Sequence, residues 1–264
     1  MSDVPVTYTI ADGVGTITLN RPEGMNGLNL ATKEALLEAV TSAAADETVR
    51  CVVLTGTGRA FCVGQDLKEH VELLNSGSTD ALFTTVEKHY NPIVTAIAEM
   101  PKPVIAALNG VAAGAGASLA FACDLRIMAA SAGFNLAFPG VALSCDTGAS
   151  WTLPRLVGRA KAIELLYFPS TISADDALAL GLATRVVADE DLVAEVTTLA
   201  TRLASGPTLS YASIRQSVNY ASSHDFASSL AFEGEKMNFT GASADHRRAV
   251  DAFLAKEKPS FEGR

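Results

Sequence analysis

The chain has 264 residues, of which 48% are hydrophobic and 19% charged, and its formal net charge is −9. This length and apolar content suit one large domain or a domain with an appendage, and they exclude a disordered chain. The acidic balance argues against a polyanion-binding surface, so we expect no nucleic-acid partner. Four well-separated cysteines without a CxxC pair indicate reduced thiols, and we expect a cytoplasmic protein.

No membrane partner is expected either. The opening residues lack a basic segment followed by an apolar one, so no secretory signal is predicted. Residues 104–123 look membrane-like at first, but they contain Asn109, three glycines and many alanines behind Pro103. A strand, a turn and a buried helix explain this stretch better than a bilayer span does.

Predicted strands alternate with predicted helices in the first half of the chain. The apolar patterns predict strands at 6–10, 14–19, 51–55, 104–108 and 125–128. They predict helices at 29–44, 84–99 and 113–122. Asn29 is the expected N-cap of the first helix, and the first two strands form a hairpin. This alternation indicates an α/β core.

Beyond about residue 190 nearly the whole chain is compatible with helix. Before that point, Ser173 to Gly181 has the capping box and glycine stop of a short helix. The helices expected after it are 191–204, 208–221, 226–240 and 243–256. We therefore place the core at 1–200 and a separate helical region at 201–264.

Three glycine clusters lack the context of a nucleotide-binding loop. Gly13-Val-Gly15 precedes a strand, and Gly56-Thr-Gly58 has no third glycine opening a helix. The run from Gly110 to Gly116 is not followed by Lys-Ser or Lys-Thr. Its free N–H groups can nevertheless stabilise a developing anion at a helix start, where small side chains permit close approach. The same small residues also suit tight helix packing.

Several motifs, in order over most of residues 5–190, resemble the crotonase, or enoyl-CoA hydratase/isomerase, superfamily. They are Leu19–Glu23, Val53–Leu67, Pro101–Gly110, Ala122–Ile127, Leu153–Gly158 and Ser173–Val187. The resemblance implies a ClpP/crotonase-like spiral of ββα units and C-terminal helices that assemble homotrimers or dimers of trimers. It also implies an acyl-CoA thioester substrate and no separate cofactor, because coenzyme A is part of the substrate.

The resemblance also implies which residues form the site. In this family two backbone N–H groups bind the thioester oxygen, and they fall here on Gln65 and Ala115. Ala115 replaces a glycine, which keeps the donor if the local backbone tolerates a Cβ. Arg59 or Lys68 would lie near a CoA phosphate. The substrate-binding residues implied are Arg59, Gly64, Asp66, Leu67, Lys68, Gly110, Gly114 and Phe138.

The chemistry explains why both kinds of group are needed. A thioester α-proton is too weakly acidic for a carboxylate to remove unaided. Two preorganised donors would stabilise an enolate oxygen by about 3–4 kcal/mol each. One positioned base then adds about 10²–10⁴-fold.

The number and position of the catalytic carboxylates distinguish the hydratases from the isomerases of this superfamily. Hydratases of this superfamily carry two glutamates, and the aligned positions here hold Ser118 and Phe138. Asp146 lies where several isomerases and a dehalogenase of the superfamily place a catalytic carboxylate. The chain most resembles ring-1,2-epoxyphenylacetyl-CoA isomerases, except that Cys145 stands where proline is usual.

A single carboxylate suits isomerisation, because one group can take a proton from one carbon and return it two carbons away. Burial of Asp146 beside Phe138 and Trp151 would raise its pKa toward useful basicity. The alternative is that Asp146 caps a helix starting near residues 147–149. We therefore predict an acyl-CoA isomerase with Asp146 as acid and base.

Other polar residues have simpler interpretations. The histidines show no metal spacing, so no metal site is expected; they are His70, His89, His224 and His246. Lys102, between two prolines, is expected to face solvent in a turn. A second carboxylate would have to come from Glu69, Glu72 or Glu87. Alternative functions are enoyl-CoA hydration, dehalogenation with Asp146 as nucleophile, and acyl-CoA binding without catalysis.

Overall fold

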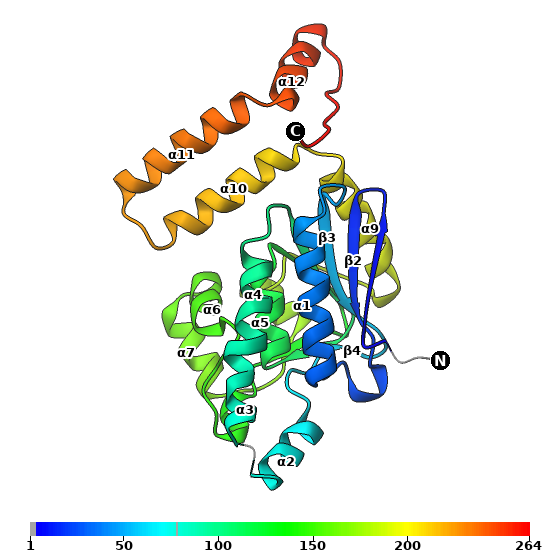
Figure 1. The fold of residues 1–264 in the computed structure, drawn as a ribbon, viewed down its shortest axis with the longest axis vertical. Coiled ribbons are helices and arrows are strands. Elements are labelled where there is room, and N and C mark those ends of the chain that lie inside the picture. Colours follow the sequence, from blue (N-terminus) through cyan, green and yellow to red (C-terminus); the bar gives the residue numbers. More distant parts are fainter. Residues whose placement is uncertain (1–3, 78) are drawn as a thin grey trace.

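Two β-sheets form the centre of the computed structural model, which describes residues 4–77 and 79–264 (Figure 1). The larger sheet has six strands in the order β1-β2-β3-β5-β7-β10. They are β1 (Val6–Ala11), β2 (Val14–Leu19), β3 (Cys51–Gly56), β5 (Val104–Leu108), β7 (Leu125–Ala129) and β10 (Arg185–Val187). The predicted β1–β2 hairpin is confirmed as the antiparallel pair, and the other neighbours are parallel.

The smaller sheet has four short strands in the order β4-β6-β8-β9. They are β4 (Ala60–Cys62), β6 (Val111–Ala113), β8 (Gly133–Asn135) and β9 (Ile172–Ser173). β4, β6 and β8 are parallel neighbours, and β9 is antiparallel to β8. None of these strands was predicted, because two or three residues are too few to show a hydrophobic period.

The chain repeats one unit, in which a strand of each sheet is followed by a helix. β3 and β4 lead to α2 (Leu67–Asn75), β5 and β6 to α5 (Ala115–Ala122), and β7 and β8 to α6 (Ala149–Val157). The expected α/β spiral of ββα units is therefore confirmed. Since β4, β6 and β8 are parallel, the segments that leave them emerge at the same edge of the smaller sheet.

The helices of the first hundred residues follow the predictions in part. α1 (Leu30–Ala45) begins after Asn29, whose side chain accepts a hydrogen bond from the backbone of Thr32. The helix predicted at 84–99 is divided in the structure among the end of α3 (Thr79–Thr85), the π-helical turn η2 (Val86–Tyr90) and α4 (Asn91–Ala98). α2 was not predicted, although its apolar residues Leu67, Val71 and Leu74 follow a helical period; it is short and buries none of its residues.

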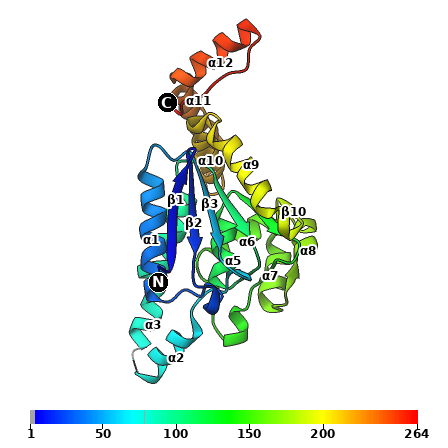
Figure 2. The same cartoon turned by 90° about the vertical axis from the view of Figure 1, so that its right-hand side faces the viewer.

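The remaining helices complete the core and extend from it. They are α7 (Arg159–Tyr167), α8 (Ala174–Ala179), α9 (Leu192–Ala204), α10 (Thr208–Ala221), α11 (Phe226–Gly241) and α12 (Ala244–Ala255). Short 3-10 turns are η1 (Pro22–Gly24), η3 (Phe138–Val141) and η4 (Asp189–Asp191). In Figure 2 α1 and α9 flank the larger sheet, while α10, α11 and α12 project away from the body. The four C-terminal helices were predicted to within a residue or two of each end.

Lys102 corrects one prediction, because it is 4% exposed and does not face solvent. Its Nζ donates to the carbonyl oxygens of Ala43 at 2.8 Å and Asp46 at 2.7 Å. These carbonyls lie at the C-terminal end of α1, where a cation satisfies free acceptors and the negative end of the helix dipole. Lys102 is therefore a structural cap for α1.

No helix among the described residues combines the length and the apolar character needed to cross a bilayer.

Candidate active site

Three chain segments that follow strands of the smaller sheet carry the candidate site residues. Gly64 and Gln65 follow β4, Gly114 and Ala115 follow β6, and the segment containing Asp146 lies between β8 and α6. A methyl group in place of the Gly64 hydrogen would lie 3.1 Å from the backbone nitrogen of Ala115. The two amides expected to bind the thioester oxygen are therefore brought together by the fold.

Both amides are free to bind a ligand. The carbonyl oxygen of Gly64 accepts from the backbone N–H of Leu28 at 2.7 Å, so the trans peptide turns the Gln65 N–H the opposite way. Ala115 is the first residue of α5, where backbone N–H groups have no partner within the helix. Within the described part of the chain, neither N–H donates a hydrogen bond to the protein.

The backbone at these positions explains the residue types. Gly64 has φ +82° and Gly114 has φ +51°, conformations that disfavour any residue with a Cβ. Ala115 by contrast begins the helix, and its small side chain is buried. Alanine in place of glycine thus keeps the donor without strain.

The other glycines of the run are required by packing. A methyl group on Gly116 would lie 2.1 Å from the carbonyl oxygen of Cys62, and one on Gly110 would lie 2.1 Å from that of Arg59. α5 and the turn before β6 therefore press directly on the β4 main chain. Within the run from Gly110 to Gly116, Gly110 and Gly116 are therefore required for close packing, whereas Ala115 offers a backbone N–H to an anion.

Asp146 lies half-buried in the segment before α6. Burial raises the pKa of its carboxyl, and a hydrogen bond from the Thr147 hydroxyl to Oδ1, 2.9 Å long, partly opposes that rise. α6 begins after Gly148, and the carboxylate is engaged by Thr147 instead of by the helix start. The helix-capping interpretation of Asp146 therefore has no hydrogen bond to support it.

Tyr90 contacts Gln65 and was missed by the sequence analysis. Its hydroxyl donates to Oε1 of Gln65. Burial raises the pKa of Tyr90, and the charge of Asp146 raises it further, so the phenol stays protonated. No local motif marks this tyrosine, because its partners lie in other elements.

The carboxylate of Asp66 already has partners within the protein. Its Oδ2 forms an ion pair with Nη1 of Arg21 at 2.9 Å, and its Oδ1 caps α2 by accepting from the backbone of Lys68 and Glu69. Burial raises the pKa of the Asp66 carboxyl, but these hydrogen bonds outweigh it and the pKa is lowered overall. Arg59, Leu67 and Lys68 are exposed beside this segment.

The positions of the two hydratase glutamates carry no acid. Ser118 is fully buried and its hydroxyl donates to the carbonyl oxygen of Gly114 at 3.2 Å. Phe138 is buried as well, with Cε1 3.9 Å from where a methyl group on Gly114 would lie. Phe138 thus forms an apolar wall beside the free amide of Ala115.

The three glutamates considered as a second acid differ in their surroundings. Glu69 accepts from the backbone N–H of Leu30 at 2.7 Å, from Nζ of Lys33 at 3.3 Å and from Nε2 of Gln65 at 3.2 Å. Glu72 and Glu87 are exposed. The Glu69 carboxylate is therefore held by hydrogen bonds within the protein, and the carboxylates of Glu72 and Glu87 lie on the surface.

No group of three His, Cys, Asp or Glu side chains within the described residues is arranged to hold a metal ion. None of the four cysteines, all of them within the described residues, forms a disulfide in the structure.

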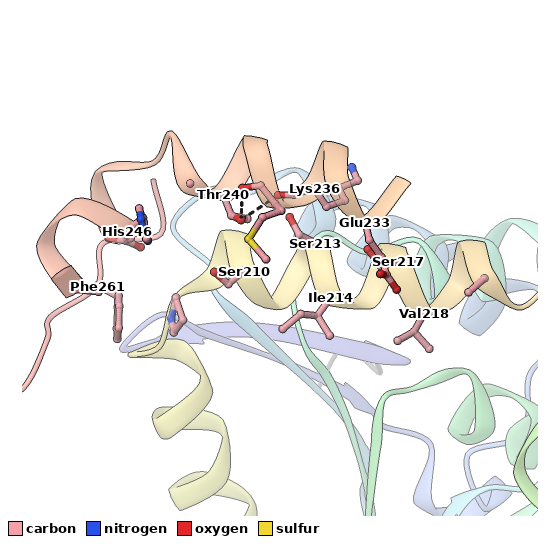
Figure 3. Close-up of a pocket in the computed structure, with 16 residues that line it drawn as sticks. Ser210, Ser213, Ile214, Ser217, Val218, Glu233, Lys236, Thr240, His246 and Phe261 are labelled. Atoms are coloured by element: carbon pink, nitrogen blue, oxygen red, sulfur yellow. Dashed lines mark hydrogen bonds between the residues drawn. The ribbon is translucent and has the colours of Figure 1, made fainter. Parts of the chain in front are cut away.

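A large groove lies elsewhere, between the projecting helices (Figure 3). It has a volume of about 1010 Å³ and is lined by residues of α10, α11, α12 and the C-terminal tail. Its apolar lining includes Ile214 and Val218 of α10 and Met237 of α11. Gln65, Ala115 and Asp146 are not among its lining residues, so it is separate from the candidate active site.

Comparisons with known proteins identify the family. The family model described as enoyl-CoA hydratase/isomerase matches residues 9–264. The 1,2-epoxyphenylacetyl-CoA isomerase of Escherichia coli is 43% identical over 97% of each chain, and a probable enoyl-CoA hydratase of Rhodobacter capsulatus is 42% identical over the whole of both chains. The crystal structure of an enoyl-CoA hydratase from Polaromonas superposes with a TM-score of 0.91 at 34% identity, covering 97% of this chain and 99% of that one. The chain therefore belongs to the enoyl-CoA hydratase/isomerase family of enzymes, which has the crotonase fold.

Proposed function

We propose that the protein is an acyl-CoA isomerase that moves a double bond or opens a strained ring beside a CoA thioester. The observations that carry this proposal are the two free backbone amides of Gln65 and Ala115 and the half-buried carboxylate of Asp146. The relative named 1,2-epoxyphenylacetyl-CoA isomerase supports it. No cofactor is needed, because the reactive thioester is part of the substrate.

The two amides act on the carbonyl. The N–H groups of Gln65 and Ala115 donate to the thioester oxygen and stabilise the negative charge that develops there. Because Ala115 opens α5, the positive end of that helix dipole adds to the stabilisation. Phe138 covers this position with an apolar side chain, and charge interactions are stronger where water is excluded.

Asp146 moves the proton. As a carboxylate it takes a proton from one carbon of the acyl chain, and the C–H electron pair passes into the conjugated enolate. The resulting carboxylic acid returns the same proton to a carbon two positions away, which restores the carboxylate and leaves the substrate isomerised. The raised pKa makes Asp146 a stronger base than an exposed aspartate.

Hydration is the alternative that the comparisons keep open, because a relative 42% identical is named a probable enoyl-CoA hydratase. Two-carboxylate hydration needs an acid where this chain has Ser118 and Phe138, both buried without a carboxylate. The structure of the site therefore favours isomerisation over hydration.

Absorbance of acyl-CoA thioesters distinguishes the possibilities. With a β,γ-unsaturated acyl-CoA, an isomerase produces the conjugated thioester and absorbance rises. With an α,β-unsaturated acyl-CoA, a hydratase removes the conjugation and absorbance falls. Release of halide from a halogenated aryl-CoA would show Asp146 acting as a nucleophile, and binding without any spectral change would show a non-catalytic protein.

Asp146→Asn is the decisive variant. We expect it to lower isomerisation by about 10²–10⁴-fold, the range for a positioned acid or base, while acyl-CoA binding persists. Glu72→Gln, which neutralises an exposed carboxylate of α2, is the matched control. Turnover by Asp146→Asn equal to that of the parent protein would remove Asp146 from the mechanism.

The CoA moiety would bind along the exposed start of α2. Leu67 and Lys68 are exposed there, and Arg59 is exposed in the neighbouring turn. Arg59 and Lys68 would attract the phosphates of the CoA nucleotide and no other part of the substrate. Arg59→Ala and Lys68→Ala should therefore raise the KM for a CoA thioester. They should leave the KM for the matching pantetheine thioester, which lacks that nucleotide, unchanged.

The helical region 201–264 would serve to assemble a homotrimer or a dimer of trimers around the core at 1–200. Ile214, Val218 and Met237 are each more than 60% exposed and line the groove between α10 and α11, and an exposed apolar patch of this kind suits a subunit interface. Ile214→Lys/Met237→Lys should give a smaller particle by light scattering. An oligomer unchanged by both charges would contradict this assembly surface.

An acyl-CoA enzyme with free thiols is expected in the cytoplasm.

A further inference from the structure

A buried lysine lies under the Gln65 side chain. Lys33 of α1 is 3% exposed, and its Nζ lies 2.9 Å from Oγ1 of Thr85, 3.3 Å from Oε2 of Glu69 and 3.4 Å from Oε1 of Gln65. Burying an ammonium group is costly unless it is well paired. The proposed reaction uses neither Lys33 nor Glu69, so their place beside an oxyanion-binding residue needs an explanation.

The carboxamide of Gln65 is held at both ends. Its Oε1 accepts from the hydroxyl of Tyr90 and from Lys33, and its Nε2 donates to Glu69. The three partners belong to three different elements, namely η2, α1 and α2. A glutamine side chain is ordinarily free to change rotamer, whereas this network allows it one position.

This anchor complements the one on the main chain. The Leu28–Gly64 hydrogen bond orients the peptide that carries the Gln65 N–H, and the carboxamide network fixes the Cα on the other side. An oxyanion donor is effective only when it lies about 2.7–3.1 Å from the oxygen. A displacement of about 1 Å at a reacting centre can cost about 10²-fold in rate.

We propose that Lys33 and Tyr90 are positioning residues, which act through the Gln65 side chain to hold the Gln65 N–H against the thioester oxygen. The proposal rests on the proposed oxyanion-binding role of Gln65. It extends the site to α1 and η2, from which the sequence analysis drew no functional residue.

Lys102 provides a matched control for the buried charge. It is buried to the same degree as Lys33, at 4% exposed, but it donates to main-chain carbonyls at the end of α1. Lys33→Met and Lys102→Met therefore remove the same group from equally buried places. Both variants should lose stability, and only the first should disturb Gln65.

A bound chromophore reports the position of the amide directly. In 4-methoxycinnamoyl-CoA the arene donates electrons toward the thioester carbonyl, so hydrogen bonds to that oxygen shift its absorption to longer wavelength. This probe cannot be isomerised, because its γ-carbon belongs to the aromatic ring and carries no hydrogen. It is bound to Asp146→Asn proteins, which also lack the proposed acid and base. The shift is then compared among Asp146→Asn alone and Asp146→Asn combined with Lys33→Met, Tyr90→Phe or Lys102→Met.

We expect the Lys33→Met and Tyr90→Phe proteins to lose most of the red shift, with Kd for the chromophore changed less than 3-fold. With Asp146 restored, both should lower kcat by about 10- to 100-fold with little change in KM. The Lys102→Met protein should keep the shift and kcat. Gln65→Ala should reproduce Lys33→Met, and the double variant should lose little more, because both act through one side chain.

The outcomes distinguish the oxyanion-binding role of Gln65 from the positioning role of Lys33 and Tyr90. If Asp146→Asn alone gives no red shift, the oxyanion-binding role of Gln65 fails and the positioning role fails with it. If that protein shifts the chromophore and the Lys33→Met and Tyr90→Phe proteins shift it equally, the positioning role alone is overturned. Lys33→Met/Glu69→Gln, which leaves no unpaired carboxylate, provides the measurement if Lys33→Met does not fold.

Discussion

Gly64 lies so close to Ala115 that a methyl group on Gly64 would approach the Ala115 nitrogen to 3.1 Å and the Ala113 carbonyl oxygen to 2.9 Å. Both atoms belong to the main chain, which cannot rotate away as a side chain can. The separation of the two candidate oxyanion donors is therefore set by the absence of a side chain at residue 64.

Gly64→Ala should push the β4 and β6 segments apart and lower kcat by at least about 10-fold, because a displaced donor no longer reaches the thioester oxygen. Gly77→Ala is the matched control, since Gly77 also has positive φ, +72° against +82°, but has nothing within 4 Å of the added methyl group. Both variants carry the cost of positive φ, and the clash is specific to Gly64. Equal kcat values for the two variants would show that the close approach is unimportant.

The sequence predicted those parts of the fold whose residues interact locally. Asn29 was identified as an N-cap because capping involves a side chain and a backbone N–H only three residues apart. The smaller sheet escaped prediction because strands such as β4 are defined by pairing with distant segments. The local sequence pattern does not identify a pairing strand that lies far away in the chain.

The same distinction applies to the site. Gln65, Ala115 and Asp146 were identified through the family resemblance, because each lies in a recognisable segment. Lys33 and Tyr90 lie outside those segments, and their importance depends on contacts with Gln65, which is 32 positions from Lys33 along the chain. Lys102 was misplaced for the same reason, since its partners lie at the far end of another helix.

Thr147 should tune the basicity of Asp146. Its hydroxyl lowers the pKa of that carboxyl through the 2.9 Å hydrogen bond, against the larger effect of burial. Thr147→Val keeps the shape and removes the hydroxyl, so the pKa of Asp146 should rise further. The acid limb of the kcat/KM profile should then move to higher pH, since Asp146 must be deprotonated to act as a base. Thr147→Ser, which keeps the hydroxyl, should restore the original limb, and an acid limb unmoved by Thr147→Val would show that another group controls it.

Asp66 should contribute to stability in a defined pH range. Its pKa is lowered in the folded protein, against burial, by hydrogen bonds from Arg21 and from the start of α2. The stabilisation is therefore present above the unfolded value of about 3.9 and is lost as pH falls through the lower folded pKa. Asp66→Asn should lower the free energy of unfolding at pH 7 by about 1 kcal/mol. In urea titrations the difference from the parent protein should shrink below pH 4, and a constant difference would contradict the ionic origin.

Asp146 should show the opposite dependence, because its pKa is raised in the folded protein by burial. Folding then favours the protonated carboxyl, so this contribution is fully present below about pH 3.9 and is lost as pH rises through the folded pKa. Asp146→Asn replaces the ionised group with a neutral one of the same shape, and it should raise Tm at pH 7 although it removes activity. Thermal unfolding at several pH values should show the gain vanishing in acid. A Tm at pH 7 below that of the parent protein would mean that the carboxylate stabilises the fold, and a base role that depends on a raised pKa would lose its physical basis.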